Sequence, residues 1–229
     1  MLILIRHGES VANAQGLLVG RTDAELTPKG MAQASSVSLL LRDPILALRT
    51  SPLSRARDTA ALVALSLQGE PGLPREPGLP SETGLPIEVD DRWVEVDYGE
   101  YECQPLGEIP ADVWREWQGD PSFRPDGGES LADVDARVAA ACDELFTADG
   151  LGARAAAGDI AVVSHVTPIK AAVAWALGMT AELSWRLHLQ TASVTRIGWG
   201  NGHPVLYGFN EVMPNRDALT ATREGFLHE

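Results

Sequence analysis

Short apolar runs alternate along the chain with longer stretches in which apolar residues recur every three or four positions. Residues 2–5 (LILI) and 159–165 (DIAVVSH) are apolar on both faces that a strand would present. Strands of this kind are typical of a parallel sheet that helices cover on both sides. Residues 45–51 (ILALRTS) form a third strand candidate.

The longer stretches predict helices with recognisable ends. They cover residues 28–42, 54–67, 130–147 and 167–177. Thr27 followed by Pro28 is an N-cap with proline at the first helical position, and Ser130 with Asp133 resembles a capping box. Gly178 ends the last of these helices. Three of the four predicted helices therefore have a start or stop signal in addition to their periodicity or composition.

Residues 193–199 and 204–209 predict two strands around the Asn201-Gly202 turn, which is typical of a hairpin. Together with the alternating strands and helices, this pattern predicts an α/β fold: a three-layer sandwich with a largely parallel central sheet and helices on both faces. A length of 229 residues does not require a second domain, so we expect one domain over residues 1–229.

Residues 69–86 interrupt the pattern with a near-repeat of six residues, EPGLP, EPGLP and ETGLP. Proline and glycine at this density exclude a helix or a paired strand, so we interpret the segment as an extended insertion. A docking site for a partner is the less favoured interpretation.

Composition narrows the function classes. The formal net charge of −14 argues against nucleic-acid binding, which needs a basic face. The first apolar run is too short for a signal peptide or a membrane span, and two cysteines, Cys103 and Cys142, are too few for a disulfide framework. We therefore expect a cytoplasmic protein, with the oligomeric state open and a homodimer as one expectation.

Polar residues with catalytic potential follow three of the predicted strands. Arg6 and His7 follow the first strand, Arg55 comes shortly after the second, and His165 ends the strand at 159–165. In a parallel sheet the carboxyl ends of the strands form the ligand-binding edge, so neighbouring strands would bring these four side chains into one crevice.

This set of side chains suits the chemistry of a phosphate ester. Guanidinium groups match phosphate oxygens, one imidazole can attack phosphorus, and the second can stabilise charge on the transferring group. The leaving alcohol needs a proton donor. Glu95 is the leading candidate because it follows the strand-like segment 87–94, and Asp97, Glu100 and Glu102 remain alternatives.

Five segments in this order resemble the histidine phosphatase superfamily, which includes the cofactor-dependent phosphoglycerate mutases. They are LIRHGES, SPLSRARDTA, RWVEVDYGEYE, GGES (127–130) and VVSHVTP. The resemblance implies that His7 is the phosphorylated nucleophile and that Arg6, Arg55 and His165 form the phosphate pocket. It also implies that Asn13 donates a hydrogen bond to the phosphoryl group, that Glu95 is the proton donor, and that neither a metal nor an organic cofactor takes part.

The sequence departs from the mutase pattern after Tyr98-Gly99. EYECQPLGEIP is acidic there and lacks the lysine of the mutases' substrate-binding stretch, and GGES is more typical of phosphatase branches. We therefore favour a metal-independent phosphomonoesterase for a small phosphorylated metabolite over a mutase. A silent protein that binds phosphorylated ligands is the third alternative.

The remaining expectations concern the segment around 100–130, which occupies the place of the family's substrate-covering lid. Trp114 and Trp117 are three residues apart, so we expect them to pack on one helix face. Glu129 and Ser130 are assigned to capping of the next helix.

Overall fold

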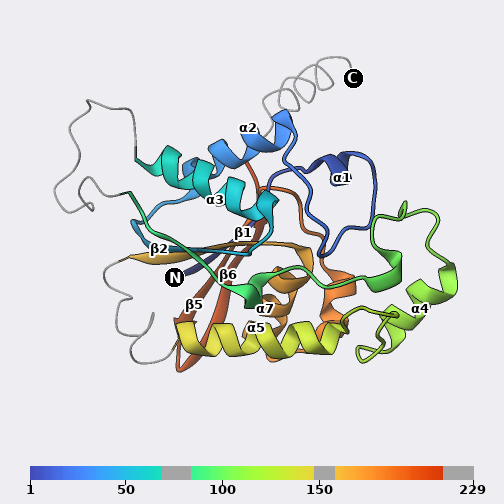
Figure 1. Cartoon of the computed structure of the whole chain (residues 1–229). Coiled ribbons are helices and arrows are strands. Elements are labelled where there is room, and N and C mark those ends of the chain that lie inside the picture. Colours follow the sequence, from blue (N-terminus) through green and yellow to red (C-terminus); the bar gives the residue numbers. More distant parts are fainter. Residues whose placement is uncertain (69–83, 147–157, 214–229) are drawn as a thin grey trace, which may run out of the picture.

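The computed structural model describes residues 1–68, 84–146 and 158–213, which contain a six-stranded sheet in the order β3-β2-β4-β1-β5-β6 (Figure 1). The strands are β1 (Leu2–Arg6), β2 (Ile45–Thr50), β3 (Ile87–Val89), β4 (Asp159–Ser164), β5 (Val194–Gly200) and β6 (His203–Glu211). Strands β1 to β4 are parallel to their neighbours in this group, and β5 pairs antiparallel with β1 and with β6. The predicted largely parallel α/β sheet is confirmed.

Helices cover both faces of this sheet. They are α1 (Val11–Ala14), α2 (Pro28–Ser36), α3 (Ser54–Leu67), α4 (Ala111–Gly119), α5 (Leu131–Leu145) and α7 (Val166–Leu177), with the short 3₁₀ helices η1 (Val37–Leu40), η2 (Asp91–Trp93), η3 (Gly99–Tyr101) and η4 (Ala181–Arg186). Figure 1 shows α2 and α3 on one face and α5 and α7 on the other, while α4 lies beyond the edge of the sheet.

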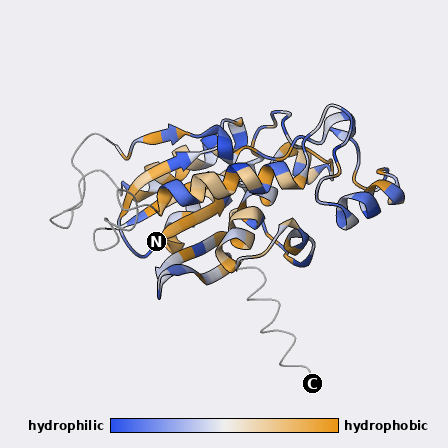
Figure 2. Ribbon diagram, turned by 90° about the horizontal axis from the view of Figure 1, so that it is seen from below, coloured by the Kyte–Doolittle hydropathy of each residue, from blue (hydrophilic) through white to orange (hydrophobic). Residues whose placement is uncertain are grey.

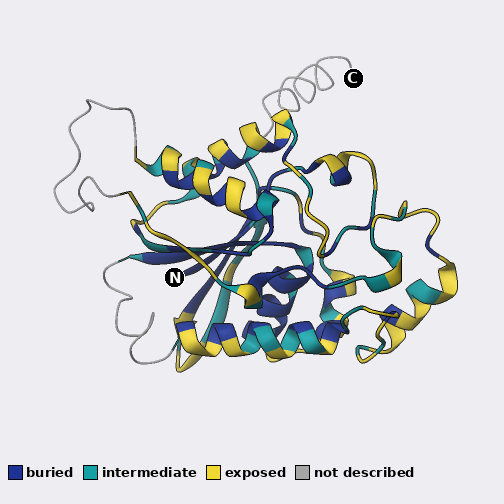
Figure 3. Cartoon of the chain, viewed as in Figure 1, coloured by how far each residue is buried: buried dark blue, intermediate teal, exposed yellow. Residues whose placement is uncertain are grey.

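The alternation of side chains along β1 explains the two layers of core. Leu2 and Leu4 face the cluster that includes α5 and α7, whereas Ile3 and Ile5 face the cluster under α3. All four are fully buried, and the central strands β1 and β4 are buried along nearly their whole length, whereas β3 and β6 at the two edges of the sheet are not (Figures 2 and 3). The strand that carries the catalytic candidates is thus a rigid mount inside the protein.

The capping signals in the sequence have the predicted effects. Thr27 and Ser130 accept hydrogen bonds at the starts of α2 and α5, and Gly178 ends α7 in the left-handed conformation. Asn201 and Gly202 both have positive φ, as a tight hairpin turn between β5 and β6 requires. Local sequence chemistry therefore determines these boundaries.

The structure differs from the predictions in two segments. The helix expected over 28–42 ends at Ser36 and continues as η1 only to Leu40. The strand expected before Glu95 ends already at Val89, and η2 follows it, so Glu95 does not lie at a strand rim.

Part of the predicted insertion, residues 69–83, and the predicted end of the helix at Thr147 lie outside the described residues. Within the described ranges, none of the helices combines the length and the apolar character that crossing a bilayer requires.

Candidate active site

The carboxyl ends of β1, β2 and β4 lie side by side because β4 is between the other two strands. His7 follows β1, Ser51 follows β2, and His165 follows β4. The rings of His7 and His165 are tilted against each other with centroids 5.0 Å apart, and both are buried. The two predicted histidines therefore meet in one site.

The hydrogen bond of His7 fixes which of its nitrogens can react. Nδ1 lies 2.7 Å from the carbonyl oxygen of Gly8, which can only accept a hydrogen bond. Nδ1 therefore carries the proton of the neutral ring, and Nε2 keeps its lone pair. This tautomer makes Nε2 the nucleophilic atom.

Ser51 orients His165. The Nε2 atom of His165 lies 2.6 Å from the Ser51 hydroxyl oxygen, which also accepts a hydrogen bond from the backbone N–H of Leu53. When the hydroxyl donates to Nε2, Nδ1 of His165 carries the proton and becomes a donor toward the site. Ser51 was not among the predicted site residues, although this serine begins the SPLSRARDTA segment.

Arg55 and Arg6 are held by backbone carbonyl groups. The Arg55 guanidinium donates to the carbonyl oxygens of Thr22 (2.9 Å) and Gly20 (2.7 Å), and Arg6 donates to that of Leu189 (2.6 Å). Because these carbonyl groups use only some of the five N–H donors of each guanidinium, both groups keep donors for an anion.

Two polar atoms of this cluster are buried without a hydrogen-bond partner among the described residues: Nε of Arg6 and Nδ1 of His165. Buried polar groups are almost always paired, because an unmade hydrogen bond costs about 1–3 kcal/mol. A bound phosphoryl group would supply acceptor oxygens to such donors.

Burial and positive charge keep the two histidines neutral. Burial lowers the pKa of His7 well below 6.5, and Arg6 and Arg55 lower it further. Burial is also the main reason why the pKa of His165 is lowered, and the positive charges around it add to this effect. A neutral His7 is the form that can attack an electrophile.

Glu95 is buried beside these cations and is anchored by the start of α7. Its carboxylate accepts backbone hydrogen bonds from Val166 (3.1 Å), Thr167 (3.2 Å) and Val96 (2.9 Å). Its charge acts to raise the pKa of Arg6 and Arg55, against the stronger lowering effect of burial. The structure thus brings Glu95 to the site through a helix N-terminus and not through a strand end.

A group of charged side chains holds the backbone of Glu95. Arg21 (2.9 Å) and Arg137 (3.4 Å) donate to the Glu95 carbonyl oxygen, and Glu129 forms ion pairs with both arginines. The assignment of Glu129 to helix capping is therefore wrong, because Ser130 and Asp133 alone form the capping box. All of these contacts except the Glu129–Arg137 pair join residues more than 40 positions apart, so no local sequence signal could have revealed them.

Two further residues support the backbone around His7 and Arg55. Thr59 accepts a hydrogen bond from the backbone of Gly8 (3.1 Å) and donates to the Arg55 carbonyl (2.7 Å). Glu102 accepts hydrogen bonds from the backbone N–H groups of residues 20, 21, 22 and 98. The spacing of Thr59 four residues after Arg55 is a helical signal that could have been used.

Asn13 lies in α1, six residues after His7, and its side chain completes a capping box with Ser10 at the start of this helix. Its carbonyl oxygen accepts the Ser10 N–H, which leaves the amide N–H₂ group as a donor. A contact between Asn13 and a phosphoryl group remains a prediction. In the described part of the chain no three His, Cys, Asp or Glu side chains are grouped so that they could hold a metal ion.

The chain matches a known family and part of a longer curated protein. Residues 2–212 match the family model of the histidine phosphatase superfamily (branch 1). A bifunctional protein of Mycobacterium tuberculosis is 34% identical over 199 residues, which are 85% of this chain and 49% of that protein. The chain therefore spans about half the length of this curated relative.

A curated relative and two solved structures are similar over nearly their whole length. A putative phosphoserine phosphatase 2 of Hydrogenobacter thermophilus is 26% identical, with 94% of this chain and 97% of that protein covered. A phosphoserine phosphatase of Entamoeba histolytica in complex with 3-phosphoglyceric acid has a TM-score of 0.74 at 27% identity, with 93% and 97% covered. A mycobacterial glucosyl-3-phosphoglycerate phosphatase has a TM-score of 0.74 at 27% identity, with 91% and 98% covered.

Proposed function

Because this chain belongs to the histidine phosphatase superfamily, branch 1, we propose that it is a metal-independent phosphomonoesterase that works through a phosphohistidine. The observation that carries the proposal is the buried cluster of His7, His165, Arg6 and Arg55, in which Nε of Arg6 and Nδ1 of His165 have no partner within the described residues. Such a cluster suits a tetrahedral dianion.

In the first step the phosphoryl oxygens bind to Arg6, Arg55 and Nδ1 of His165. Nε2 of His7 attacks phosphorus in line with the ester oxygen, so the P–N bond forms as the P–O bond to the alcohol breaks. Protonated Glu95 gives its proton to the alcohol oxygen, which leaves as the neutral alcohol.

In the second step water attacks the phosphorus of phosphorylated His7. Ionised Glu95 accepts a proton from this water, the P–N bond breaks, and inorganic phosphate is released. His7 and protonated Glu95 are then restored. The overall reaction consumes one water per ester and needs no other reactant.

A mutase is the second candidate, because phosphoglycerate mutases are among the similar proteins; one from Methylobacterium is 31% identical over 199 residues. A mutase would use the same cluster and return the phosphoryl group to its product. Assaying 3-phosphoglycerate for release of phosphate against isomerisation separates the two, and we expect release without isomerisation.

The test of the proposal is to trap the intermediate. Brief incubation with ³²P-labelled 4-nitrophenyl phosphate in the presence of EDTA, followed by an alkaline quench, should leave label on the protein that acid removes. His7→Ala should abolish both this label and turnover, whereas His203→Ala, an exposed histidine outside the site, should keep both. Full turnover by His7→Ala would overturn the mechanism, and absence of label and of turnover in the wild type would favour the silent phosphate-binding protein.

A further inference from the structure

A cavity of about 210 Å³ lies beside the start of α7, whose backbone holds the Glu95 carboxylate. Val166 and Thr167 line this cavity, and their backbone N–H groups are the donors that hold Glu95. In the proposed reaction Glu95 protonates the alcohol oxygen. The carbon skeleton of the alcohol therefore extends from this point, and the cavity is the space that receives it.

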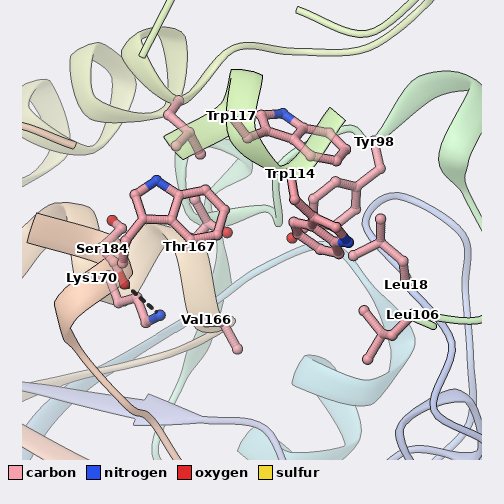
Figure 4. Close-up of a pocket in the computed structure, with 11 residues that line it drawn as sticks. Leu18, Tyr98, Leu106, Trp114, Trp117, Val166, Thr167, Lys170 and Ser184 are labelled. Carbon is pink, nitrogen blue, oxygen red and sulfur yellow. Dashed lines mark hydrogen bonds between the residues drawn. The ribbon is translucent and has the colours of Figure 1, made fainter. Parts of the chain in front are cut away.

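Four aromatic residues, Tyr98, Trp114, Trp117 and Trp185, line the cavity together with aliphatic and polar residues from several segments. Trp114 and Trp117 of α4 pack with ring centroids 5.4 Å apart, which confirms the expected packing, and Trp185 of η4 meets Trp114 edge-on at 6.2 Å. Figure 4 shows the rings of Trp114 and Trp117 beside a central space, with Leu18 and Leu106 on one side and Lys170 and Ser184 on the other. The cavity is thus a slot with indole walls.

Size and surface chemistry indicate the shape of the occupant. An apolar cavity of roughly 150 Å³ can bind benzene, so about 210 Å³ holds a substituted ring. Aromatic rings gain both from burial of apolar area and from edge or offset contacts with other rings. A short polar alcohol such as serine or glycerate would instead leave the indole surfaces without contacts.

Lys170 supplies the one positive charge among the described lining residues. Its Nζ donates to the Ser184 carbonyl oxygen at 2.8 Å, and an ammonium group has three N–H donors. Burial lowers the pKa of this lysine. Lys170 lines the cavity, so its remaining N–H donors are available there. A hydrogen-bond acceptor on the far side of the ring would meet them.

We propose that the substrates are phosphomonoesters whose alcohol carries a flat apolar ring that packs against Trp114 and Trp185 in the cavity, with a hydrogen-bond acceptor that reaches Lys170. This proposal rests on the phosphomonoesterase function and specifies the alcohol that the enzyme accepts. It assigns Trp114, Trp185 and Lys170 to selection of the substrate and not to the chemical steps.

The test compares 2-phenylethyl phosphate with propyl phosphate. Both leave as primary alcohols of similar basicity, so a difference in kcat/KM reports contacts in the cavity and not the quality of the leaving group. We expect kcat/KM to be about 30-fold higher for the phenylethyl ester, as burial of a ring implies. Equal kcat/KM values for two hydrolysed esters would overturn the inference and leave the proposed function intact.

A matched pair of variants localises the effect. Trp185→Ala should reduce the preference to less than about fivefold, whereas Trp199→Ala should leave it unchanged, because Trp199 is also exposed but stacks on Phe146 away from the cavity. Trp114→Ala is a second variant in case the first does not fold. A preference that survives both folded substitutions would contradict the assignment of the slot.

Lys170 is tested with 2-(4-carboxyphenyl)ethyl phosphate. The wild type should prefer this ester over 2-phenylethyl phosphate by about threefold or more, and Lys170→Met should reverse the preference. If the wild type and Lys170→Met show the same preference between the two esters, Lys170 does not bind an acceptor on the ring and this part of the proposal is wrong.

Binding to His7→Ala separates failure of the inference from failure of the function. Calorimetry with this variant measures the Kd of each ester without turnover, and we expect the phenylethyl ester to bind at least about tenfold more tightly than the propyl ester. If the wild type hydrolyses neither ester but this difference is found, the slot is supported and the phosphomonoesterase is not. If hydrolysis is found without a difference in binding or turnover, the slot is wrong.

Discussion

The two sides of the candidate site are built on different principles. On the phosphate side, charged side chains follow strand ends of the central sheet and are fixed by backbone partners, as with Arg55 on the carbonyls of Gly20 and Thr22. On the alcohol side, aromatic rings from α4 and η4 pack against one another outside the sheet. In the proposed function the first arrangement recognises a group that every phosphomonoester shares, and the proposed second one recognises the part in which such esters differ.

This contrast predicts that a substitution on the phosphate side lowers kcat/KM for all esters equally. The loss of kcat/KM caused by a substitution on the alcohol side should differ from one ester to another. Glu95 lies at the border, because it contacts α7 on one side and approaches the cations on the other.

Glu95→Gln should have the largest effect, and this effect should depend on the ester. Glutamine keeps the shape of the side chain but cannot transfer the proton, so we expect kcat/KM for 2-phenylethyl phosphate to fall about 10³-fold. 4-Nitrophenyl phosphate has a leaving group that needs no proton, so its kcat/KM should fall only about tenfold. Glu100→Gln, an exposed neighbour, is the control; equal losses on both esters would contradict the proton-donor role.

Arg55→Lys should lower kcat/KM by about 10²-fold for every ester. Lysine keeps the charge but loses the planar fork that bridges two backbone carbonyls and the phosphoryl group. Steady-state kinetics on propyl and 2-phenylethyl phosphate measures this. Arg57→Lys, on the exposed face of the same helix, should have no effect. A loss of kcat/KM in Arg55→Lys that is confined to one ester would contradict the division of the site into a phosphate side and an alcohol side.

The pH dependence of stability should reveal the buried histidines of the phosphate side. The pKa values of His7 and His165 lie well below 6.5 in the folded protein, because burial opposes their charged forms. Below pH 6.5 the unfolded chain therefore binds protons that the native site excludes. The free energy of unfolding should then fall with decreasing pH, by up to about 1.4 kcal/mol per pH unit for each histidine.

Urea unfolding of the wild type between pH 7.5 and 5 measures this slope. The double variant His7→Asn, His165→Asn should show a flatter dependence over the same range. An identical slope in the two proteins would mean that these histidines are protonated in the native state.

Glu102→Gln should have the smallest effect, about fivefold on kcat/KM. The carboxylate accepts N–H groups from residues 20–22, the loop whose carbonyls bind Arg55, and an amide nitrogen cannot accept them. The loss should be equal for propyl and 2-phenylethyl phosphate, and the melting temperature should decrease. Glu108→Gln, exposed in the same segment, is the control, and a loss only with the ring-bearing ester would place Glu102 on the alcohol side.

The phosphate side could be predicted from the sequence because its signals are local. An apolar strand followed by Arg6-His7, or by His165, already places the side chain at the binding edge once the strands are taken as parallel neighbours. Thr27, Ser130 and Gly178 likewise mark helix ends through their own backbone or side-chain chemistry.

The parts that escaped prediction depend on contacts between distant segments. Trp114 and Trp185 are 71 positions apart and share no pattern, so only the folded chain shows that they form one slot. The support of Glu95 by Arg21 and Arg137 is of the same kind. The position of Glu95 at the end of a strand was predicted wrongly, because residues 87–94 resemble one long strand, whereas the strand ends at Val89.

The link between Glu95 and α7 runs through the main-chain amides of Val166 and Thr167. Every residue except proline offers such an amide, whatever its side chain. Evolution or an engineer could therefore reshape the slot by exchanging the side chains that border it while the proton carrier keeps its anchor. Enzymes that share one reaction but differ in the metabolite they consume could arise on this scaffold by steps that each preserve turnover.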